Sequence, residues 1–505
     1  MTIGYFLITV AFIAAIVSAT AYILYYKEKQ EPLLRLGNQS FVVMGISIAT
    51  SLAMLIYSIL THNFQINYVY NYSSTALNKF YLFSTLWAGQ EGTFMLWLFY
   101  GVIYGFILIK ITARKRPLVM FFLLLVQVFL LLILLKKNPF AMIWHAHEQV
   151  PVGFMPSDGA GLNPLLQNNW MVIHPPTLFL GYSSTVVPFA FAMAAMVSRN
   201  FQGWIKEARP WVIFNVMILG TGIIMGGYWA YTTLGWGGYW GWDPVENASL
   251  VPWIFGLALL HGLIIQAKRQ ALVKTNFFLA GTVFLTMIWG SFLTRSGVLT
   301  DFSVHSFGAS GLNLYLMIFQ GLFTLLFLGV FFNAISYYKK IEEEPIRFGD
   351  GLLNRETFIL AGMLTLVLTG LFVLFGTSSP IYTSWFGDPA SLSPDFYNTM
   401  ITPVVIAMLI VISIAPLLAW KTSELRNVST ILWSAAGALL LTLLAFFVGL
   451  THLLSIVLFF LAAFVIIVNL KVTFLFLKRN FGNAGGYLAH VGIGFMVIGI
   501  LTSSL

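Results

Sequence analysis

Long runs of uncharged, mostly apolar residues alternate along this chain with short polar segments. About fourteen of these runs approach the length of about 20 residues that a helix needs to cross the hydrocarbon of a bilayer. They lie near residues 3–26, 39–61, 92–110, 117–135, 175–198, 211–229, 248–267, 275–294, 312–338, 357–376, 401–420, 430–449, 452–470 and 486–503. Helices of this length satisfy their own backbone hydrogen bonds in lipid. The pattern therefore predicts an all-α polytopic membrane protein with about 14 transmembrane helices.

The longer connecting segments are rich in Gly, Pro, Asn and aromatic residues and carry few charges. They span residues 62–91, 136–174, 230–247, 295–311 and 377–400. Within them, Phe80–Ala88 and Asn163–Asn169 have the amphipathic character of short interfacial helices. Because binding and catalytic residues concentrate on loops, we expect the chemistry on the side of the membrane that these loops reach.

Basic residues predict the orientation of the chain. When alternate loops are assigned to alternate sides, all but four of the 26 Lys and Arg residues fall on one side. The exceptions are Lys79, Lys136, Lys137 and Arg295. The positive-inside rule makes the basic side cytoplasmic and places the N-terminus, the C-terminus and the long loops outside. This bias accounts for the net charge of +9 without a nucleic-acid partner.

The remaining composition predicts a single membrane-embedded body. The basic loops are too short to form a soluble domain, so residues 1–505 are predicted to be one transmembrane domain. The first apolar run lacks a basic segment before it, which indicates a retained span and not a cleaved signal peptide. The chain has no cysteine, so helix packing alone must hold the fold and the chain supplies no thiol.

Tryptophan is concentrated between Trp229 and Trp253. Five of the fifteen tryptophans lie there, where a random distribution would place fewer than one. Interfacial aromatic belts explain scattered tryptophans but not this cluster. Its central residues are Trp236, Tyr239, Trp240, Trp242, Asp243, Glu246 and Asn247. We interpret residues 229–253 as a platform, a wide flat apolar surface for a planar ligand, and expect Asp243 to cap a helix that begins at Pro244.

Two histidines, His261 and His490, lie inside predicted spans, in the half nearer the basic side. Ionisable residues at that depth are rare and usually mark cofactor or proton sites. One interpretation is a hydrogen bond between helices from a neutral imidazole. The other is a pair of axial ligands to a buried haem, which needs two imidazoles at one depth.

A second pair, His174 and His305, lies at the outer ends of helices, on the same side as the tryptophan cluster. His174 precedes Pro175 and Pro176, a pair suited to the start of a helix. These two imidazoles are candidate ligands for the iron of a macrocycle on the platform, and Arg295 is a candidate partner for a propionate. The alternative for a loop histidine is simple solvent exposure. The pair in His145-Ala146-His147 lacks further ligands and is a weak metal signal.

The tryptophan-rich stretch resembles the WWD motif of haem-handling membrane proteins. The whole chain resembles, nearly end to end, the family of cytochrome c maturation protein F (CcmF), the haem lyase subunit of a bacterial maturation system. The resemblance is carried in order by Gly89–Trp97, by Gly161–Leu166 leading to His174–Pro176, by Trp236–Trp253, by Thr294–Leu299 and by Leu488–His490.

This resemblance implies a function. In the family, the residues matching His174 and His305 ligate a haem that arrives from the haem chaperone CcmE and is held over the WWD surface. Those matching His261 and His490 hold a permanent b-type haem that reduces the incoming iron, with quinol as one candidate electron source. The lyase joins the haem vinyl groups to both thiols of a Cys-Xaa-Xaa-Cys-His segment in apocytochrome c.

The resemblance also implies a setting. The apocytochrome is delivered with help from CcmH and CcmI-type partners, and the protein works in a complex as a holocytochrome c synthase-type enzyme. Its place is the bacterial inner membrane, with the active face toward the periplasm or exterior. The missing cysteines fit this activity, because both sulfurs belong to the substrate.

The chain departs from the family pattern in two ways, and two rival functions are alternatives to the lyase. Tyr239 and Gly241 stand where the motif is usually more aromatic. Family members usually continue past the helix of His490 into a soluble outer domain and one more span, which we expect to be absent here. A haem exporter would need a polar route across the bilayer, and a quinol-to-haem electron carrier would not need the platform. The sequence assigns no acid or base catalyst.

Overall fold

The computed structural model describes residues 2–233, 238–303, 311–338, 351–420, 428–477 and 484–503. These residues are helices joined by turns and loops, and their only β pairing is an isolated bridge between Ile66 and Met142. Fourteen spans among the described residues are long and apolar enough to cross a membrane, with α8 and α9 together forming one of them. The prediction of an all-α polytopic membrane protein is confirmed.

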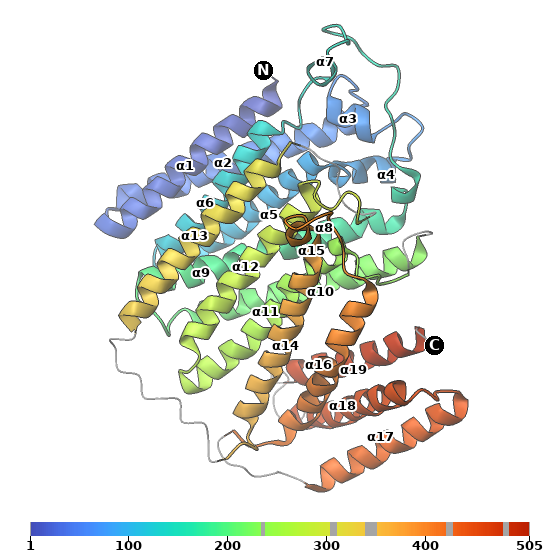
Figure 1. Cartoon of the computed structure of the whole chain (residues 1–505). Helices are drawn as coiled ribbons and strands as arrows, with labels where there is room; N and C mark the ends of the chain where they lie inside the picture. The colour runs from blue at the N-terminus through green and yellow to red at the C-terminus, as the bar shows by residue number, and fades with distance from the viewer. Residues whose placement is uncertain are drawn as a thin grey trace. The chain divides into compact units, whose positions relative to one another are not determined.

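Figure 1 shows the elements in chain order. The helices are α1 (Ile3–Glu28), α2 (Glu31–Leu60), α3 (Asn67–Tyr72), α4 (Lys79–Ser84), η1 (Thr85–Trp87), α5 (Gln90–Ile111), α6 (Pro117–Lys136), α7 (Ile143–Ala146), η2 (Pro164–Leu166), α8 (Asn169–Ser184), α9 (Val186–Val197), α10 (Ile205–Thr232), α11 (Pro244–Arg269), α12 (Val273–Arg295), α13 (Asn313–Tyr338), α14 (Arg355–Thr377), α15 (Ser379–Thr383), α16 (Pro394–Ile414), η3 (Ala415–Leu417), α17 (Val428–Val448), α18 (Leu453–Leu477) and α19 (Gly485–Ser503).

Several helices extend beyond the apolar run that predicts them. The run near 39–61 becomes α2, which begins at Glu31, and the run near 211–229 becomes α10, which begins at Ile205. Polar residues at a helix end continue the backbone hydrogen bonds without adding hydropathy. The apolar run therefore underestimates the length of the helix. The two amphipathic segments are also helical, as α4 with η1 and as η2.

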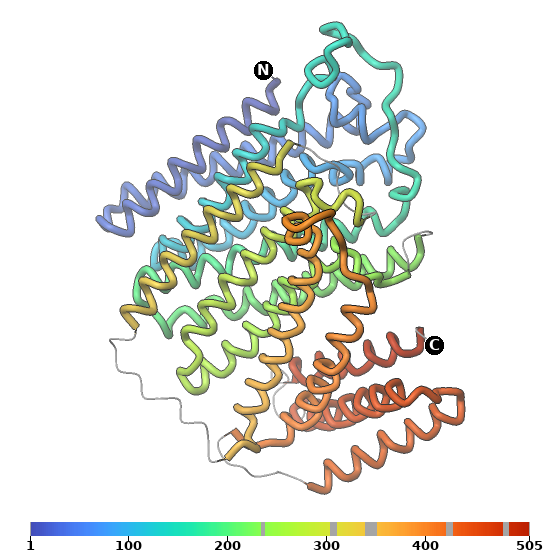
Figure 2. Tube along the Cα trace, in the orientation of Figure 1, coloured from blue at the N-terminus to red at the C-terminus, as the bar shows by residue number. Residues whose placement is uncertain are grey.

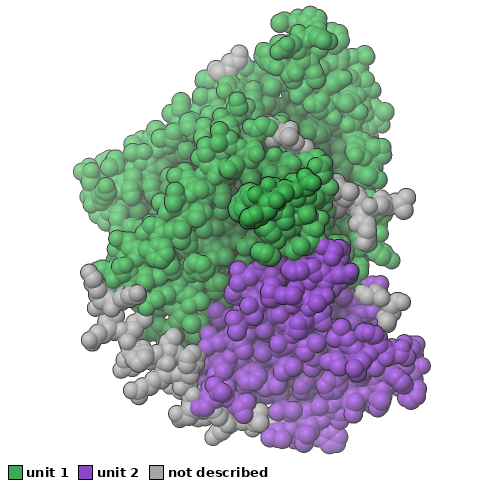
Figure 3. All heavy atoms as spheres, in the orientation of Figure 1, with its two compact units in different colours: residues 1–341, 374–392 green, residues 342–373, 393–505 purple. Residues whose placement is uncertain are grey.

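The described residues form two compact units, which Figure 3 distinguishes by colour. Unit 1 comprises residues 1–341 and 374–392, and unit 2 comprises residues 342–373 and 393–505. Unit 1 therefore holds α1 to α13 and α15, with the tryptophan-rich loop. The prediction of one transmembrane domain and the predicted orientation of the termini stay predictions.

Unit 1 is a helical bundle with an aromatic core. The α1–α2 hairpin packs against α6, which in turn contacts α9 (Figure 2). Stacked rings join the helices further along, with Phe129 against Phe319 at 4.5 Å and Phe189 against Phe284 at 4.3 Å between ring centroids. At one end the segment from Asn138 to Gly161 lies on α3, because Ala160 donates its backbone N–H to the carbonyl of Tyr70.

Unit 2 is held by apolar contacts among α16, α18 and α19. Leu409, Ala462, Val465 and Val497 are buried together there. Asn469 on α18 is fully buried, and its amide donates to the carbonyls of Val465 and of Ile412 on α16.

Candidate functional site

His174 lies inside α8 and not ahead of its first turn. The helix begins at Asn169, where the side chain of Asn168 caps it by accepting from the N–H of Trp170. Pro175 and Pro176 are interior to the helix, so the expectation that they mark its start is wrong. Pro175 has no N–H for the carbonyl of Met171 four residues earlier. The indole of Trp87 donates to that carbonyl at 2.6 Å, which satisfies the group that the proline leaves open.

The imidazole of His174 is oriented by α10. Its Nδ1 lies 2.9 Å from the backbone carbonyl of Gly222. A carbonyl only accepts, so Nδ1 carries the proton and Nε2 carries the lone pair that can coordinate a metal. The ring also meets Trp229 edge to face, with 5.7 Å between centroids. The half-buried histidine is thus held in one tautomer and one orientation.

Glycines on α10 make room for this arrangement. A β-carbon built on Gly226 would lie 2.6 Å from Cε1 of His174, closer than side chains approach. We call the described residues 238–243 between α10 and α11 the WWD loop. A β-carbon on Gly227, the residue after Gly226, would lie 3.0 Å from the carbonyl oxygen of Tyr239 in this loop. Gly226 and Gly227, which we call the α10 glycine pair, therefore let α8 and the WWD loop approach the same point of α10.

The WWD loop ends in a capping box. The Asp243 side chain accepts from the N–H of Val245, and Glu246 accepts from the backbone N–H groups of Asp243 and Gly241. Asn247 donates its amide to the carbonyl of Trp242. The prediction that Asp243 caps the helix after Pro244 is confirmed. These polar side chains thus shape the loop.

The rings of the loop do not form a single flat surface. Trp240 and Trp242 meet edge to face, at 86° and 5.9 Å between centroids. Trp242 has a left-handed backbone, with φ of 56°, which turns its side chain away from the plane that an extended chain would give. The expectation of a wide flat platform is therefore wrong for these two rings, which form a corner. Trp236 lies outside the described residues.

A hydrogen bond joins this loop to the segment that leads to His305. The hydroxyl of Ser303 donates to Asp243 Oδ1 at 2.8 Å. His305 lies two residues later, outside the described residues. The predicted pairing of His174 with His305 stays a prediction. The hydrogen bond of Ser303 brings the described residues 296–303, which follow α12, to the WWD loop.

Arg295 is inside the protein. Its side chain is 4% exposed and donates to Thr93 on α5 at 2.8 Å. The guanidinium lies over the rings of Phe94 and Phe179, at 4.9 and 5.3 Å from their centroids. It therefore ties α12 to α5 and α8. The contact predicted between Arg295 and a propionate stays a prediction.

The two histidines of the predicted buried haem belong to different units. His261 lies on α11 in unit 1, and its Nδ1 is 2.8 Å from the carbonyl of Leu257 one turn earlier. By the same argument as for His174, Nε2 carries the lone pair. His490 lies on α19 in unit 2 and is half-buried. The predicted pairing of His261 with His490 stays a prediction.

Three contributors to the site were not predicted: Trp87, the α10 glycine pair and Ser303. Gly226 of this pair did have a signal, since it follows Gly222 with the four-residue spacing of small residues at close helix crossings. Trp87 and Ser303 act through contacts with Met171 and Asp243 that are distant along the chain, and no local pattern indicates them. Among the described residues no group of three or more His, Asp or Glu could hold a metal ion, which gives His145 and His147 no added support.

Comparison with known proteins identifies the family. A family model described as Cytochrome C assembly protein matches residues 87–299, which include Trp87, His174, the WWD loop, His261 and Arg295. The chain is 32% identical to CcmF of Pseudomonas fluorescens over 93% of its own length and 71% of that protein. It is 33% identical to CcmF of Pseudomonas aeruginosa, over 90% and 70%, and 30% identical to CcmF of Escherichia coli K12, over 91% and 71%.

A solved structure supports the fold. The cytochrome c haem lyase CcmF aligns with a TM-score of 0.78 at 24% identity, over 99% of this chain and 77% of that one. At this identity the likeness concerns the fold alone, whereas the sequence relatives establish descent. The chain therefore belongs to the CcmF family of cytochrome c-type biogenesis proteins.

Proposed function

We propose that this protein is a haem lyase that attaches haem to apocytochrome c at the outer face of the bacterial inner membrane. The observation that carries the proposal is the α10 glycine pair, which brings His174 and the WWD loop to one point of a helix. The contact of Nδ1 with Gly222 makes Nε2 the nitrogen of His174 that carries the lone pair. Imidazole is a favoured ligand of haem iron. Membership of the CcmF family gives this geometry its chemical context.

In this proposal haem is the substrate and the chain positions it. His174 is one axial ligand, His305 is the other, and Trp240, Trp242 and Tyr239 contact the macrocycle. The corner formed by Trp240 and Trp242 offers one ring face and one ring edge, so we expect the macrocycle to stack on one indole and abut the other. The haem arrives from CcmE, and the apocytochrome is presented by CcmH and CcmI-type partners.

The reaction adds each substrate thiol across one haem vinyl group. The S–H bond and the vinyl π bond break, a carbon–sulfur bond forms at one vinyl carbon, and the other vinyl carbon gains the proton that the thiol loses. No electrons are gained or lost in the addition itself. Holding the vinyl carbons beside the sulfurs can lower the barrier by several kcal/mol through orientation alone. Asp243 and Glu246 cap a helix here, and we assign them no proton transfer.

We also propose that His261 would hold the iron of a resident b-type haem. The donor fits, because the Nδ1 bond to Leu257 leaves Nε2 as the coordinating atom. The assignment of His490 as the second ligand rests on the sequence resemblance. Such a haem would supply the electron that reduces the incoming iron, with quinol as a candidate donor. Purified protein is expected to show a stoichiometric b-type spectrum that His261→Ala abolishes and His174→Ala keeps, and the reverse pattern would overturn the assignment.

Reconstitution separates the lyase from its rivals. The full chain in liposomes, with haem, a reductant and a Cys-Xaa-Xaa-Cys-His peptide outside, is expected to yield a peptide carrying covalent haem by mass spectrometry. A peptide with Ser in place of both Cys residues is the control and should stay unmodified. Haem crossing the bilayer with no thioether product would favour the exporter. Haem reduction without either outcome would favour the electron carrier.

A further inference from the structure

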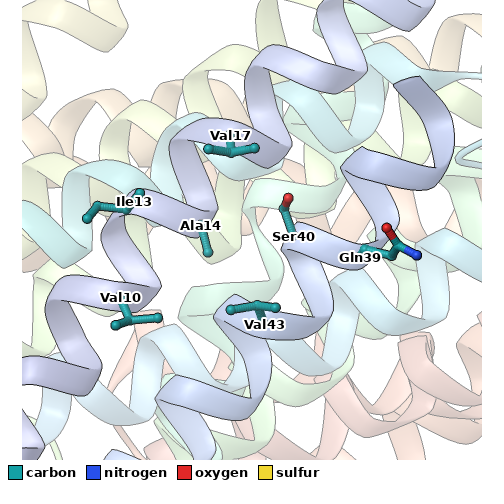
Figure 4. Close-up of a pocket in the computed structure, with 7 residues that line it drawn as sticks. All are labelled: Val10, Ile13, Ala14, Val17, Gln39, Ser40 and Val43. Atoms are coloured by element: carbon teal, nitrogen blue, oxygen red, sulfur yellow. The ribbon is translucent and has the colours of Figure 1, made fainter. Parts of the chain in front are cut away.

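A groove opens between α1 and α2 in unit 1. It has a volume of about 350 Å³ and is lined by Val10, Ile13, Ala14 and Val17 from α1 and by Gln39, Ser40 and Val43 from α2 (Figure 4). Ile13, Val17 and Val43 are 56%, 37% and 46% exposed, so the groove is open along its length.

Polar contacts make one end of this groove rigid. Ser18 on α1 donates its hydroxyl to the carbonyl of Gly37 on α2 at 2.8 Å. Tyr22, on the next turn of α1, donates to the side-chain oxygen of Asn38 at 2.6 Å. A β-carbon at Gly37 would already touch the ring of Tyr22. The hairpin is thus fixed beside the polar end of the groove, which makes the groove a lasting feature of the surface.

The groove changes from polar to apolar along its axis. Gln39 and Ser40 lie at the end nearer the α1–α2 turn, and Val10 and Ile13 lie at the far end. The side-chain amide of Gln39 is exposed and has no hydrogen-bond partner within the described part of the chain. An amide facing lipid without a partner is costly, so such residues in a span usually serve a ligand or a neighbouring helix.

The turn end of the hairpin is positively charged. Lys27, Lys29 and Arg35 lie within two turns of it and outnumber the two carboxylates there, Glu28 and Glu31. Arg35 is exposed without an ion pair to any described residue. Glu31 nearby is already paired with Arg114 from the α5–α6 turn. A ligand held between the cationic end and the apolar groove must therefore combine a negative head with a long apolar tail.

Depth along α2 favours a phospholipid as that ligand. The 30 residues of α2 span about 45 Å, against about 30 Å of hydrocarbon. With the excess shared between both ends, Arg35 lies at the hydrocarbon boundary and Gln39 lies about 5 Å below it. Ester groups lie at this boundary and phosphates lie outside it. Side chains of a helix lean toward its N-terminus, which for α2 is the turn end, so the Arg35 guanidinium can reach the phosphate level and the Gln39 amide can reach the ester level. The valines of the groove lie at the level of the acyl chains.

We propose that the groove between α1 and α2 binds an anionic phospholipid, with its phosphate at Arg35, its ester region at Gln39 and Ser40, and one acyl chain along Val17 to Val10. This binding does not depend on haem. A membrane-spanning helix of a partner protein would fill the groove without preferring an anionic head group. The two occupants therefore differ in an experiment that varies only the lipid.

Native mass spectrometry of the full chain, exchanged from detergent into a mixture of phosphatidylglycerol and phosphatidylcholine, tests this proposal. Wild type is expected to retain phosphatidylglycerol preferentially. Arg35→Gln should weaken that retention about fivefold, the factor that one cation contributes near a membrane surface. Lys110→Gln removes an exposed charge from the neighbouring end of α5 and is the matched control, with wild-type retention expected. Equal retention of both lipids by wild type, or equal effects of the two substitutions, would overturn the proposal.

The location has its own readout. Phosphatidylglycerol with a photoreactive acyl chain is expected to label peptides containing residues 10–17 and 39–43. Gln39→Leu keeps the volume of the groove but removes the amide, and it should lower retention of both lipids while leaving their ratio unchanged. Labelling confined to other helices would place the lipid elsewhere and refute the assignment, whether or not Arg35→Gln folds normally.

Discussion

Replacing Gly226 by alanine should displace the imidazole of His174. The new β-carbon would lie 2.6 Å from Cε1, whereas ordinary contact begins near 3.4 Å, so the ring must move by about 0.8 Å. Gly226 and Gly222 both belong to α10, so a ring that moves away from Gly226 also moves away from the carbonyl of Gly222. The Nδ1 distance would grow from 2.9 Å to about 3.7 Å, outside the range of a hydrogen bond.

Two magnitudes follow from that displacement. Overpacking a tight contact costs about 1–3 kcal/mol of stability. Losing the bond that orients a metal-ligating histidine lowers metal affinity by roughly 10–100-fold. We therefore expect Gly226→Ala to weaken the binding of added haem by about that factor, and to raise the share of protein whose bound haem lacks the imidazole spectrum.

The assay is a haem titration of the purified chain followed by absorbance, beside thermal unfolding in the same detergent. Gly321→Ala on α13 is the matched control, because a β-carbon there meets nothing within 4 Å. Gly321→Ala changes helix propensity as Gly226→Ala does, but it introduces no contact with a neighbouring side chain. If Gly226→Ala bound haem as wild type does, with the same spectrum, the argument that α10 positions His174 would be refuted.

Three further substitutions or conditions test the structure around the site. Trp87→Phe removes the donor to the Met171 carbonyl and should lower the unfolding free energy by about 1–3 kcal/mol, measured by unfolding in detergent; an unchanged value would mean that another group satisfies that carbonyl. Asp243→Ala removes the helix cap and should lower the unfolding free energy by about 1–2 kcal/mol. A double-mutant cycle with Ser303→Ala should show a coupling energy, whereas additive effects would mean that the hydrogen bond between the two side chains does not contribute to stability. Hydrogen bonds from Thr75 hold the pKa of Asp158 below its ordinary value of 3.8. The stabilising effect of this carboxylate is therefore full above that pH and lost as pH falls through the lower folded pKa. The protection of the Gly159 amide, taken as its exchange rate relative to the intrinsic rate at the same pH, should fall only below about pH 3.8, and a loss of protection already near pH 6 would contradict this.

The spans were predictable because every segment that crosses the hydrocarbon must satisfy its own backbone hydrogen bonds. A run of about 20 apolar residues has to be helical in lipid, and all fourteen predicted runs correspond to described helices. Helix ends were less predictable. At the start of α10, Lys206, Glu207 and Arg209 extend the helix beyond its apolar run, because charged residues are good helix formers but add no hydropathy.

The site was predictable as a set of residues and less so as a geometry. The cap at Asp243 depends on neighbours in the chain, so its pattern was sufficient. The orientation of Trp242 depends on one backbone angle, and the position of Pro175 within α8 depends on an indole from another helix. Both are contacts or conformations that no local pattern encodes, which is why the flat platform and the proline start were wrong.

The proposed role of His174 as a ligand during haem attachment has a direct test. His174→Gly removes the imidazole and leaves space that free imidazole can enter. In the reconstituted reaction we expect this variant to lose formation of covalent haem peptide and to regain it when imidazole is added, while His145→Gly on α7 keeps wild-type yield throughout. Full yield from His174→Gly without imidazole would contradict the account.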